Sequence, residues 1–180
     1  MAALDSLHVS IRRCRRCRLW KGRRKAVPGE GPCPAKMMFI GQAPGRNEDQ
    51  TGRPFVGMAG RFLDSLFNHA KIDRKRVFIT SAVKCFPPAN RPPKKDEIRA
   101  CRYYLMEQMR FVKPKAVVLL GKTACDTVLG GLDLGKAHGK RIEKDGVTYI
   151  PTYHPAAGMC FPRIKKIMEE DFRGISRTFR

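Results

Sequence analysis

Residues 37–70 read MMFIGQAPGRNEDQTGRPFVGMAGRFLDSLFNHA, and the order of patterns within them indicates the fold class. The apolar run Met37–Ile40 is typical of a buried strand. Five glycines then fall between positions 41 and 60, and glycine allows tight turns and close approach of a ligand to the backbone. Apolar side chains return at helical spacing over Met58–Ala70. A strand, a glycine-rich loop and a helix in this order predict the first unit of an α/β domain.

The same alternation continues along the rest of the chain. Three further apolar segments predict strands, and three amphipathic segments predict helices. The predicted strands are Val77–Thr80, Ala116–Leu120 and Val147–Ile150, and the predicted helices are Asp96–Val112, Thr123–Leu129 and Arg163–Phe172. We therefore expect a three-layer α/β/α fold with a central, mostly parallel, four-stranded sheet, formed by one domain over residues 1–180. In such sheets the binding site lies in the segments that follow the strands.

The charge of the chain indicates the kind of partner it binds. Its 180 residues include 37 lysines and arginines against 16 acidic residues, which gives a formal net charge of +21. Nine of the fourteen residues from Arg12 to Lys25 are basic, so the charge is clustered. Clustered positive charge attracts polyanions with an affinity that depends on salt. Nucleic acid is the expected partner, because the apolar runs are too short to cross a bilayer and no long basic amphipathic helix is evident.

The first ten residues lack the basic start and long apolar stretch of a signal peptide. We therefore expect a soluble, cytoplasmic protein, associated with the nucleoid if the source is a prokaryote. A monomer is the expected state.

Seven cysteines in such a chain are more typical of ligands or buried thiols than of disulfides. Cys14 and Cys17 form a CxxC pair, and Cys85 and Cys101 are two further candidate ligands. Four thiolates suit either a tetrahedral zinc ion or a [4Fe–4S] cluster, and the spacing leaves both open. Cys33 lies in a loop rich in proline and glycine, and it remains a competing ligand.

Three blocks of the sequence together resemble the family 4 uracil-DNA glycosylases, the iron–sulfur branch of the uracil-DNA glycosylase superfamily. The first block is the glycine-rich loop at 41–60, the second is TSAVKCFPPANRPP at 80–93, and the third is HPAA at 154–157. The resemblance implies a uracil-DNA glycosylase-like fold and excision of uracil, or another deaminated base, from DNA. It also implies a [4Fe–4S] cluster on the four candidate cysteines, with zinc as the less favoured alternative.

The resemblance implies roles for individual residues around the excised base. Backbone amides at Gln42 and Ala43, together with His154, would donate hydrogen bonds to O2 of the leaving base. Phe55 would stack on the flipped base, and Glu48 would position the attacking water or stabilise the sugar cation. Without the resemblance, His154 would be interpreted as a cap before Pro155, and Phe55 as a core aromatic.

Three further residues are assigned to the DNA by the same resemblance. Asn90 lies in the second block and is expected to contact the substrate. Met159 is the candidate wedge, on a loop that enters the minor groove, and Arg163 would bind a phosphate. The alternative for Met159 and Arg163 is an ordinary packing or surface role.

Two positions depart from the family pattern. Gln42 stands where the family usually has glutamate, and an amide cannot act as a base. Ser81 stands where the family has an asparagine that reads the edge of uracil, and a hydroxyl offers fewer hydrogen bonds on a shorter arm. We therefore expect weaker uracil excision or a broader base preference. The alternative function is a glycosylase-like module that binds DNA with little or no excision.

Overall fold

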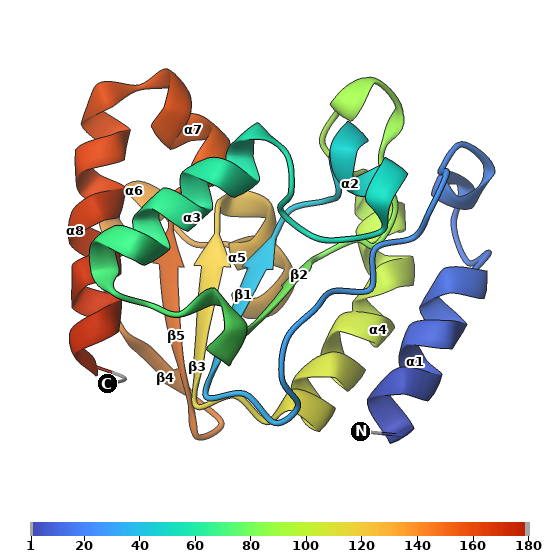
Figure 1. Ribbon diagram of the computed structural model, residues 1–180, viewed down its shortest axis with the longest axis horizontal. Helices are drawn as coiled ribbons and strands as arrows, with labels where there is room; N and C mark the ends of the chain where they lie inside the picture. Colours follow the sequence, from blue (N-terminus) through green and yellow to red (C-terminus); the bar gives the residue numbers. More distant parts are fainter. Residues whose placement is uncertain (1, 179–180) are drawn as a thin grey trace.

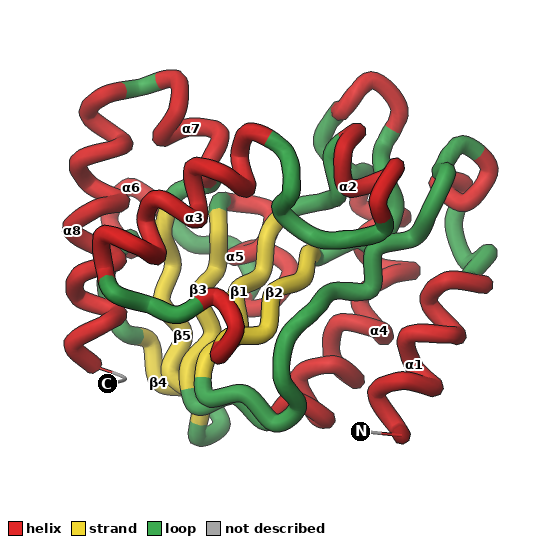
Figure 2. The backbone as a smooth tube through the Cα atoms, in the orientation of Figure 1, coloured by secondary structure: helices red, strands yellow, loops and turns green. Residues whose placement is uncertain are grey.

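The computed structural model describes residues 2–178, and its centre is a five-stranded sheet (Figures 1 and 2). The strands are β1 (Met37–Gly41), β2 (Val77–Ser81), β3 (Ala116–Leu120), β4 (Ile142–Lys144) and β5 (Val147–Thr152). Their order across the sheet is β2-β1-β3-β5-β4. Four strands are parallel, and β4 pairs with β5 in the antiparallel direction. The mostly parallel α/β fold predicted from the sequence is confirmed.

The predicted number of strands is wrong by one, because β4 was not expected. This strand has three residues, and its two charged residues, Glu143 and Lys144, are exposed. It therefore carries no apolar alternation that a sequence pattern could reveal. The turn that joins it to β5 uses left-handed backbone at Asp145 (φ 52°) and Gly146 (φ 74°), as two-residue hairpin turns require.

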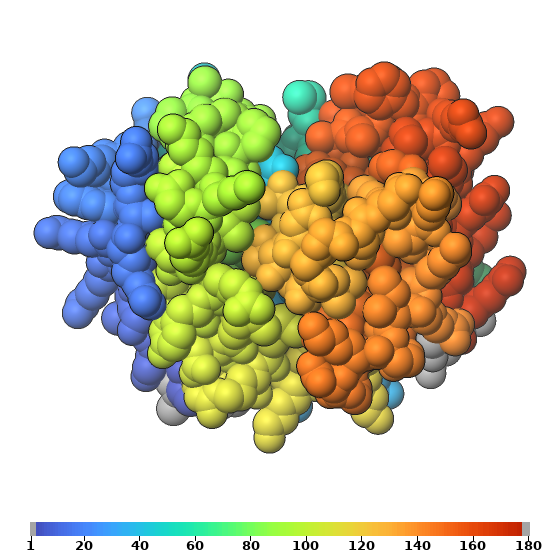
Figure 3. Space-filling model, turned by 180° about the vertical axis from the view of Figure 1, so that it is seen from behind, coloured from blue at the N-terminus to red at the C-terminus, as the bar shows by residue number. Residues whose placement is uncertain are grey.

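Helices cover both faces of the sheet. The helices are α1 (Ala2–Arg13), α2 (Arg46–Thr51), α3 (Met58–Ala70), α4 (Lys95–Val112), α5 (Lys122–Leu129), α6 (Leu134–Ala137), α7 (Pro155–Cys160) and α8 (Pro162–Thr178), with 3₁₀ turns at Arg18–Lys21, Arg74–Arg76 and Pro88–Asn90. On one face α3, α7 and α8 pack together (Figure 1). On the other face lie α1, α4 and α5, and the view from behind shows the chain around α4 and α6 covering that side (Figure 3). Within residues 2–178 no helix is both long and apolar enough to span a membrane.

Alternate side chains of the strands supply the two cores. In β1, Met38 and Ile40 join the core under α1 and α4, whereas Phe39 joins the core under α3 and α8. The Phe39 ring packs edge-on against Phe67, with the centroids 4.8 Å apart, and Phe172 completes this aromatic group. All five side chains are fully buried. This pattern explains why the strand reads as a continuous apolar run: both of its faces are covered.

The parallel strands place the segments that follow them at one edge of the sheet. The arrowheads of β1, β2, β3 and β5 point to the same edge in Figure 1, where α2 and α7 lie. Gly41 is in register with Ser81, and Leu120 is in register with Thr152. The loop after β1, the end of β2 and the HPAA segment after β5 are therefore brought together by topology alone.

Candidate active site and thiol cavity

Phe55 holds its ring against the end of β1. Its backbone is left-handed (φ 52°), a conformation that a non-glycine residue adopts only when its surroundings enforce it. A side chain on Gly41 would meet the Phe55 ring at 2.5 Å, and a side chain on Gly60 would collide with the Phe55 backbone. Both glycines are therefore required to place this ring. The ring is buried, and its centroid lies 6.1 Å from that of His154.

Glu48 organises the loop that carries Phe55. Its Oε1 accepts hydrogen bonds from the backbone N–H groups of Val56 and Gly57, both at 2.8 Å, and its Oε2 accepts from Gly45 at 3.0 Å. The carboxylate is buried, and its bonds to backbone amides compensate the cost of that burial. These contacts give Glu48 a positioning role in the loop, and its expected role toward water or sugar stays a prediction.

His154 caps α7 and is also directed toward the Phe55 ring. Its Nδ1 accepts a hydrogen bond from the backbone N–H of Ala156 at 3.2 Å, so the proton of the neutral ring is on Nε2. Burial lowers the pKa of His154 to about 4, and the negative charge of Glu48 opposes this shift only in part. The capping role and the donor role are thus compatible, because the cap fixes the tautomer that donates from Nε2.

We expect the imidazole of His154 to stay neutral through the physiological pH range. An NMR titration of the histidine ring protons should show no inflection for His154 between pH 5.5 and 8, with the resonance assigned by its loss in His154→Asn. The pKa of His154 falls on folding, so the stability that this group contributes is complete above pH 6.5 and is lost as the pH falls toward 4. A midpoint near 6.5 would contradict the expectation.

Gln42 and Ala43 leave backbone donors available at the carboxyl end of β1. Among the described residues, neither of their N–H groups donates to a protein acceptor, whereas the Gln42 carbonyl accepts from Val83 at 3.2 Å. The Gln42 side chain is fixed from α5: its Oε1 accepts from the Thr123 hydroxyl at 2.8 Å. The sequence patterns did not predict this contact. Because it occupies the amide oxygen of Gln42, the side-chain NH₂ group is the part that can donate to a ligand.

Ser81 is buried at the end of β2, beside Gly41. Its carbonyl accepts a hydrogen bond from Nζ of Lys84 at 2.7 Å, and the same ammonium donates to the Thr80 hydroxyl at 2.6 Å. Burial lowers the pKa of Lys84 to about 8. Sequence reasoning did not single out Lys84, although it lies in the second block next to a candidate ligand. Its bonds connect the wall of the base site to the thiol cavity.

The three residues assigned to DNA lie on the surface. Asn90 is exposed at the end of the 3₁₀ turn Pro88–Asn90, with a left-handed backbone (φ 56°). Met159 is 42% exposed, and Arg163 is exposed at the start of α8. The structure corrects one expectation: Met159 lies in the last turn of α7 and not in a loop. Phe161, which was not predicted, is 60% exposed and follows that turn, so it is a second apolar side chain available for a wedge.

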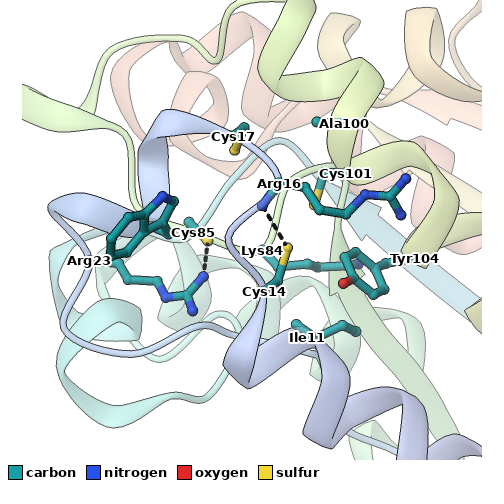
Figure 4. A pocket seen from close by; sticks show the side chains of 11 residues that line it. Ile11, Cys14, Arg16, Cys17, Arg23, Lys84, Cys85, Ala100, Cys101 and Tyr104 are labelled. Atoms are coloured by element: carbon teal, nitrogen blue, oxygen red, sulfur yellow. Dashed lines mark hydrogen bonds between the residues drawn. The ribbon is translucent and has the colours of Figure 1, made fainter.

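The four candidate cysteines line one cavity, although they come from distant parts of the sequence (Figure 4). Cys14 and Cys17 lie in the loop after α1, Cys85 follows β2, and Cys101 is on α4. Cys33 is not among the lining residues, and its thiol donates to the carbonyl of Phe111 at 3.3 Å. Cys14, Cys17, Cys85 and Cys101 therefore share one cavity that Cys33 does not line, and their role as ligands stays a prediction.

Burial favours the protonated form of three of these thiols. It raises the pKa of Cys17 and Cys85, and it raises the pKa of Cys101 to about 12. Positive groups oppose the shift: Arg23 donates to Cys85 Sγ at 3.0 Å, and the ammonium of Lys84 lowers the pKa of Cys101. Buried thiols next to fixed cations are suited to bind a metal centre as thiolates, because metal and cations together stabilise the anionic sulfur.

Four thiolates suit either a single zinc ion or a [4Fe–4S] cluster. A zinc ion needs its sulfur ligands about 2.3 Å away, which brings them close to one another. Within residues 2–178 no three cysteine, histidine or acidic side chains converge closely enough to hold one metal ion. The four thiols nevertheless line one cavity, so they remain available as ligands to either kind of centre.

Comparisons with known proteins identify the family. The sequence profile of the Uracil DNA glycosylase superfamily matches residues 28–173, so the fold and the base site define a member of that superfamily. The chain is 44% identical to the type-4 uracil-DNA glycosylase of Saccharolobus solfataricus, over 99% of this chain and 87% of that protein. It is 38% identical to the type-4 enzyme of Archaeoglobus fulgidus (97% and 92% covered), and 34% identical to the type-5 enzyme of Pyrobaculum aerophilum (85% and 75% covered). The chain belongs to the type-4 uracil-DNA glycosylases.

Proposed function

We propose that this protein is a monofunctional DNA glycosylase that flips uracil out of DNA and hydrolyses its N-glycosidic bond, which initiates base-excision repair. The observation that carries the proposal is the neutral His154, whose ring centroid lies 6.1 Å from that of Phe55. It lies at the same edge of the sheet as Gln42 and Ala43, whose N–H groups donate to no protein acceptor among the described residues. The relatives are named uracil-DNA glycosylases, which supports DNA containing uracil as the substrate.

The chemistry requires stabilisation of charge on the leaving base. When the bond between the sugar C1′ and the base nitrogen breaks, both electrons stay with the base, and negative charge accumulates on its O2. Donors that are already oriented toward this oxygen lower the barrier more than they stabilise the bound substrate. His154 and the amides after β1 supply such donors. Water then adds to C1′ of the sugar cation and loses a proton, which leaves an abasic site.

The position of Phe55 determines how the base enters. A centroid distance of 6.1 Å leaves no space for another ring between Phe55 and His154. In this proposal the base stacks on the face of Phe55 that is directed away from His154, and it presents its edge to His154. This arrangement suits hydrogen bonding to O2, and a glycosylase site must read a flipped base in this way, by stacking and by edge contacts.

The thiol cavity holds a [4Fe–4S] cluster on Cys14, Cys17, Cys85 and Cys101 in this proposal. When bound, the cluster supplies a covalent cross-link, since hydrolysis of a glycosidic bond needs no redox step. The cross-link joins the segment after α1 to the end of β2 and to α4. Arg24 and Lys25 extend this connection, because their backbone N–H groups donate to the Asp49 carboxylate in α2.

A direct assay tests the proposed function. The purified protein is incubated with a duplex that contains one uracil, and alkali then cleaves the abasic product. We expect strand cleavage only after alkali treatment, because a glycosylase without lyase activity leaves the DNA strand intact at the abasic site. Binding of the duplex without any alkali-labile product would refute the proposal.

Ser81 sets the base preference in this proposal. The Ser81→Asn change adds a donor and an acceptor at the buried end of β2, where uracil presents its O4 and N3 edge. We expect it to raise the ratio of uracil to hypoxanthine excision by about 10-fold or more, since a matched buried hydrogen bond contributes discrimination of that order. Single-turnover rates on the two substrates measure the ratio. Ser81→Ala serves as the control and should not raise it.

A further inference from the structure

We propose that the edge of the sheet opposite the base site binds a second segment of DNA through its phosphates. The inference rests on the proposed function only in taking DNA as the polyanion. Exposed cations form this surface, which we name the basic edge. Its members are Lys36, Lys71, Lys75, Arg76, Lys113 and Lys115.

The register of the sheet aligns three of these cations in a row. Met37 is in register with Val77 on one side and with Ala116 on the other. The preceding residues, Arg76, Lys36 and Lys115, are therefore neighbours across three adjacent strands, and the Lys115 N–H donates to the Lys36 carbonyl at 2.9 Å. Neighbouring strands are about 4.8 Å apart, so the backbone positions of these three cations lie within about 10 Å of one another.

These cations are not neutralised within the protein. Among the described residues none of the six makes an ion pair. Lys36, Lys71, Lys75 and Arg76 line a hollow of about 450 Å³ whose one acidic lining residue is Asp73. That carboxylate accepts a hydrogen bond from the backbone of Lys75. Adjacent like charges repel one another, and a polyanion with closely spaced phosphates relieves the repulsion.

The basic edge and the base site cannot share one straight duplex. The arrowheads in Figure 1 point away from the basic edge, which lies at the start of the strands, whereas the base site lies at their ends. The five residues of β1 separate the two edges by about 17 Å of packed protein. The occupant of the basic edge is therefore a different stretch of DNA from the one that presents the flipped base. A protein with two such surfaces can hold two duplexes or pass from one to the other.

A bridging assay tests this inference. An undamaged duplex is fixed to beads, the protein is added, and capture of a second, fluorescent duplex is measured. The test variant is Lys36→Glu/Arg76→Glu/Lys115→Glu. The control is Arg99→Glu/Lys140→Glu/Lys166→Glu, which makes the same charge change at exposed positions on α4, after α6 and on α8. The parent and the control should bridge, and the test variant should capture at least about tenfold less of the second duplex.

Salt dependence gives a second measurement that a folding defect would not imitate. Loss of three phosphate contacts should lower the slope of log capture against log salt by about 2.7. The neutral Lys36→Gln/Arg76→Gln/Lys115→Gln variant loses the same three contacts and should show the same fall in slope. Its thermal melting should match the parent, because all three side chains are exposed.

The outcomes separate this inference from the proposed function. Uracil excision from a short duplex reports on the base site alone, and it should be the same in the test and control variants. Bridging without excision would refute the proposed function and leave the basic edge supported. Three results would each overturn the inference. The first is excision without bridging, and the second is capture of labelled RNA in place of DNA. The third is equal bridging by the test variant, which two associated protein copies would give.

Discussion

Replacing His154 with asparagine is expected to lower the single-turnover rate of uracil excision by about 10²–10³-fold. That is the usual cost of removing one donor that stabilises developing negative charge. Asparagine is a good N-cap residue, so the substitution keeps an acceptor for the backbone N–H of Ala156 at the start of α7. The change therefore removes the Nε2 donor and preserves the cap.

Two controls distinguish a catalytic from a structural effect of His154. His154→Gln carries an NH₂ group closer to the position of Nε2, and it should recover part of the lost rate. The melting temperature of His154→Asn should stay within a few degrees of the parent, and its affinity for undamaged duplex should not change. An asparagine variant that excises uracil at the parental rate would remove His154 from the proposed chemistry.

Loss of two cavity thiols is expected to unfold the region that they join. Cys85→Ser/Cys101→Ser removes ligands from the loop after β2 and from α4, while Cys14 and Cys17 remain. We expect loss of the visible absorbance of an iron–sulfur protein and a fall in melting temperature on the order of 10 °C, because binding of a structural metal centre contributes directly to folding.

The matched control for the cavity is Cys160→Ser, since Cys160 is exposed and does not line it. This variant should keep the iron and sulfide content and the melting temperature of the parent. If the double variant lost its iron but kept the parental melting temperature, the cluster would not be a structural cross-link. One equivalent of zinc in place of iron and sulfide in the parent would exclude the cluster altogether.

The strands that carry the site could be predicted because each one is locally distinctive. β1 and β3 are continuous apolar runs, and such runs are covered on both faces in a parallel sheet. β4 could not be predicted, because its three residues pair with β5 by backbone hydrogen bonds and bury little. Helix α1 was missed for a related reason: its apolar face is narrow, and Leu4, Leu7 and Ile11 become a core only against α4.

The sequence by itself determined the chemistry that is available. The α/β alternation and the candidate thiols are readable from residue type and spacing. The family and the expected roles of His154 and Phe55 come from the resemblance of three sequence blocks to known glycosylases. The tertiary structure decided how these groups act. It placed the His154 proton on Nε2 through the cap of α7, committed both oxygens of Glu48 to the loop, and aligned Lys36, Arg76 and Lys115 at the far edge. Hydrogen bonds, burial and register join residues that are remote in the sequence, and no local pattern records them.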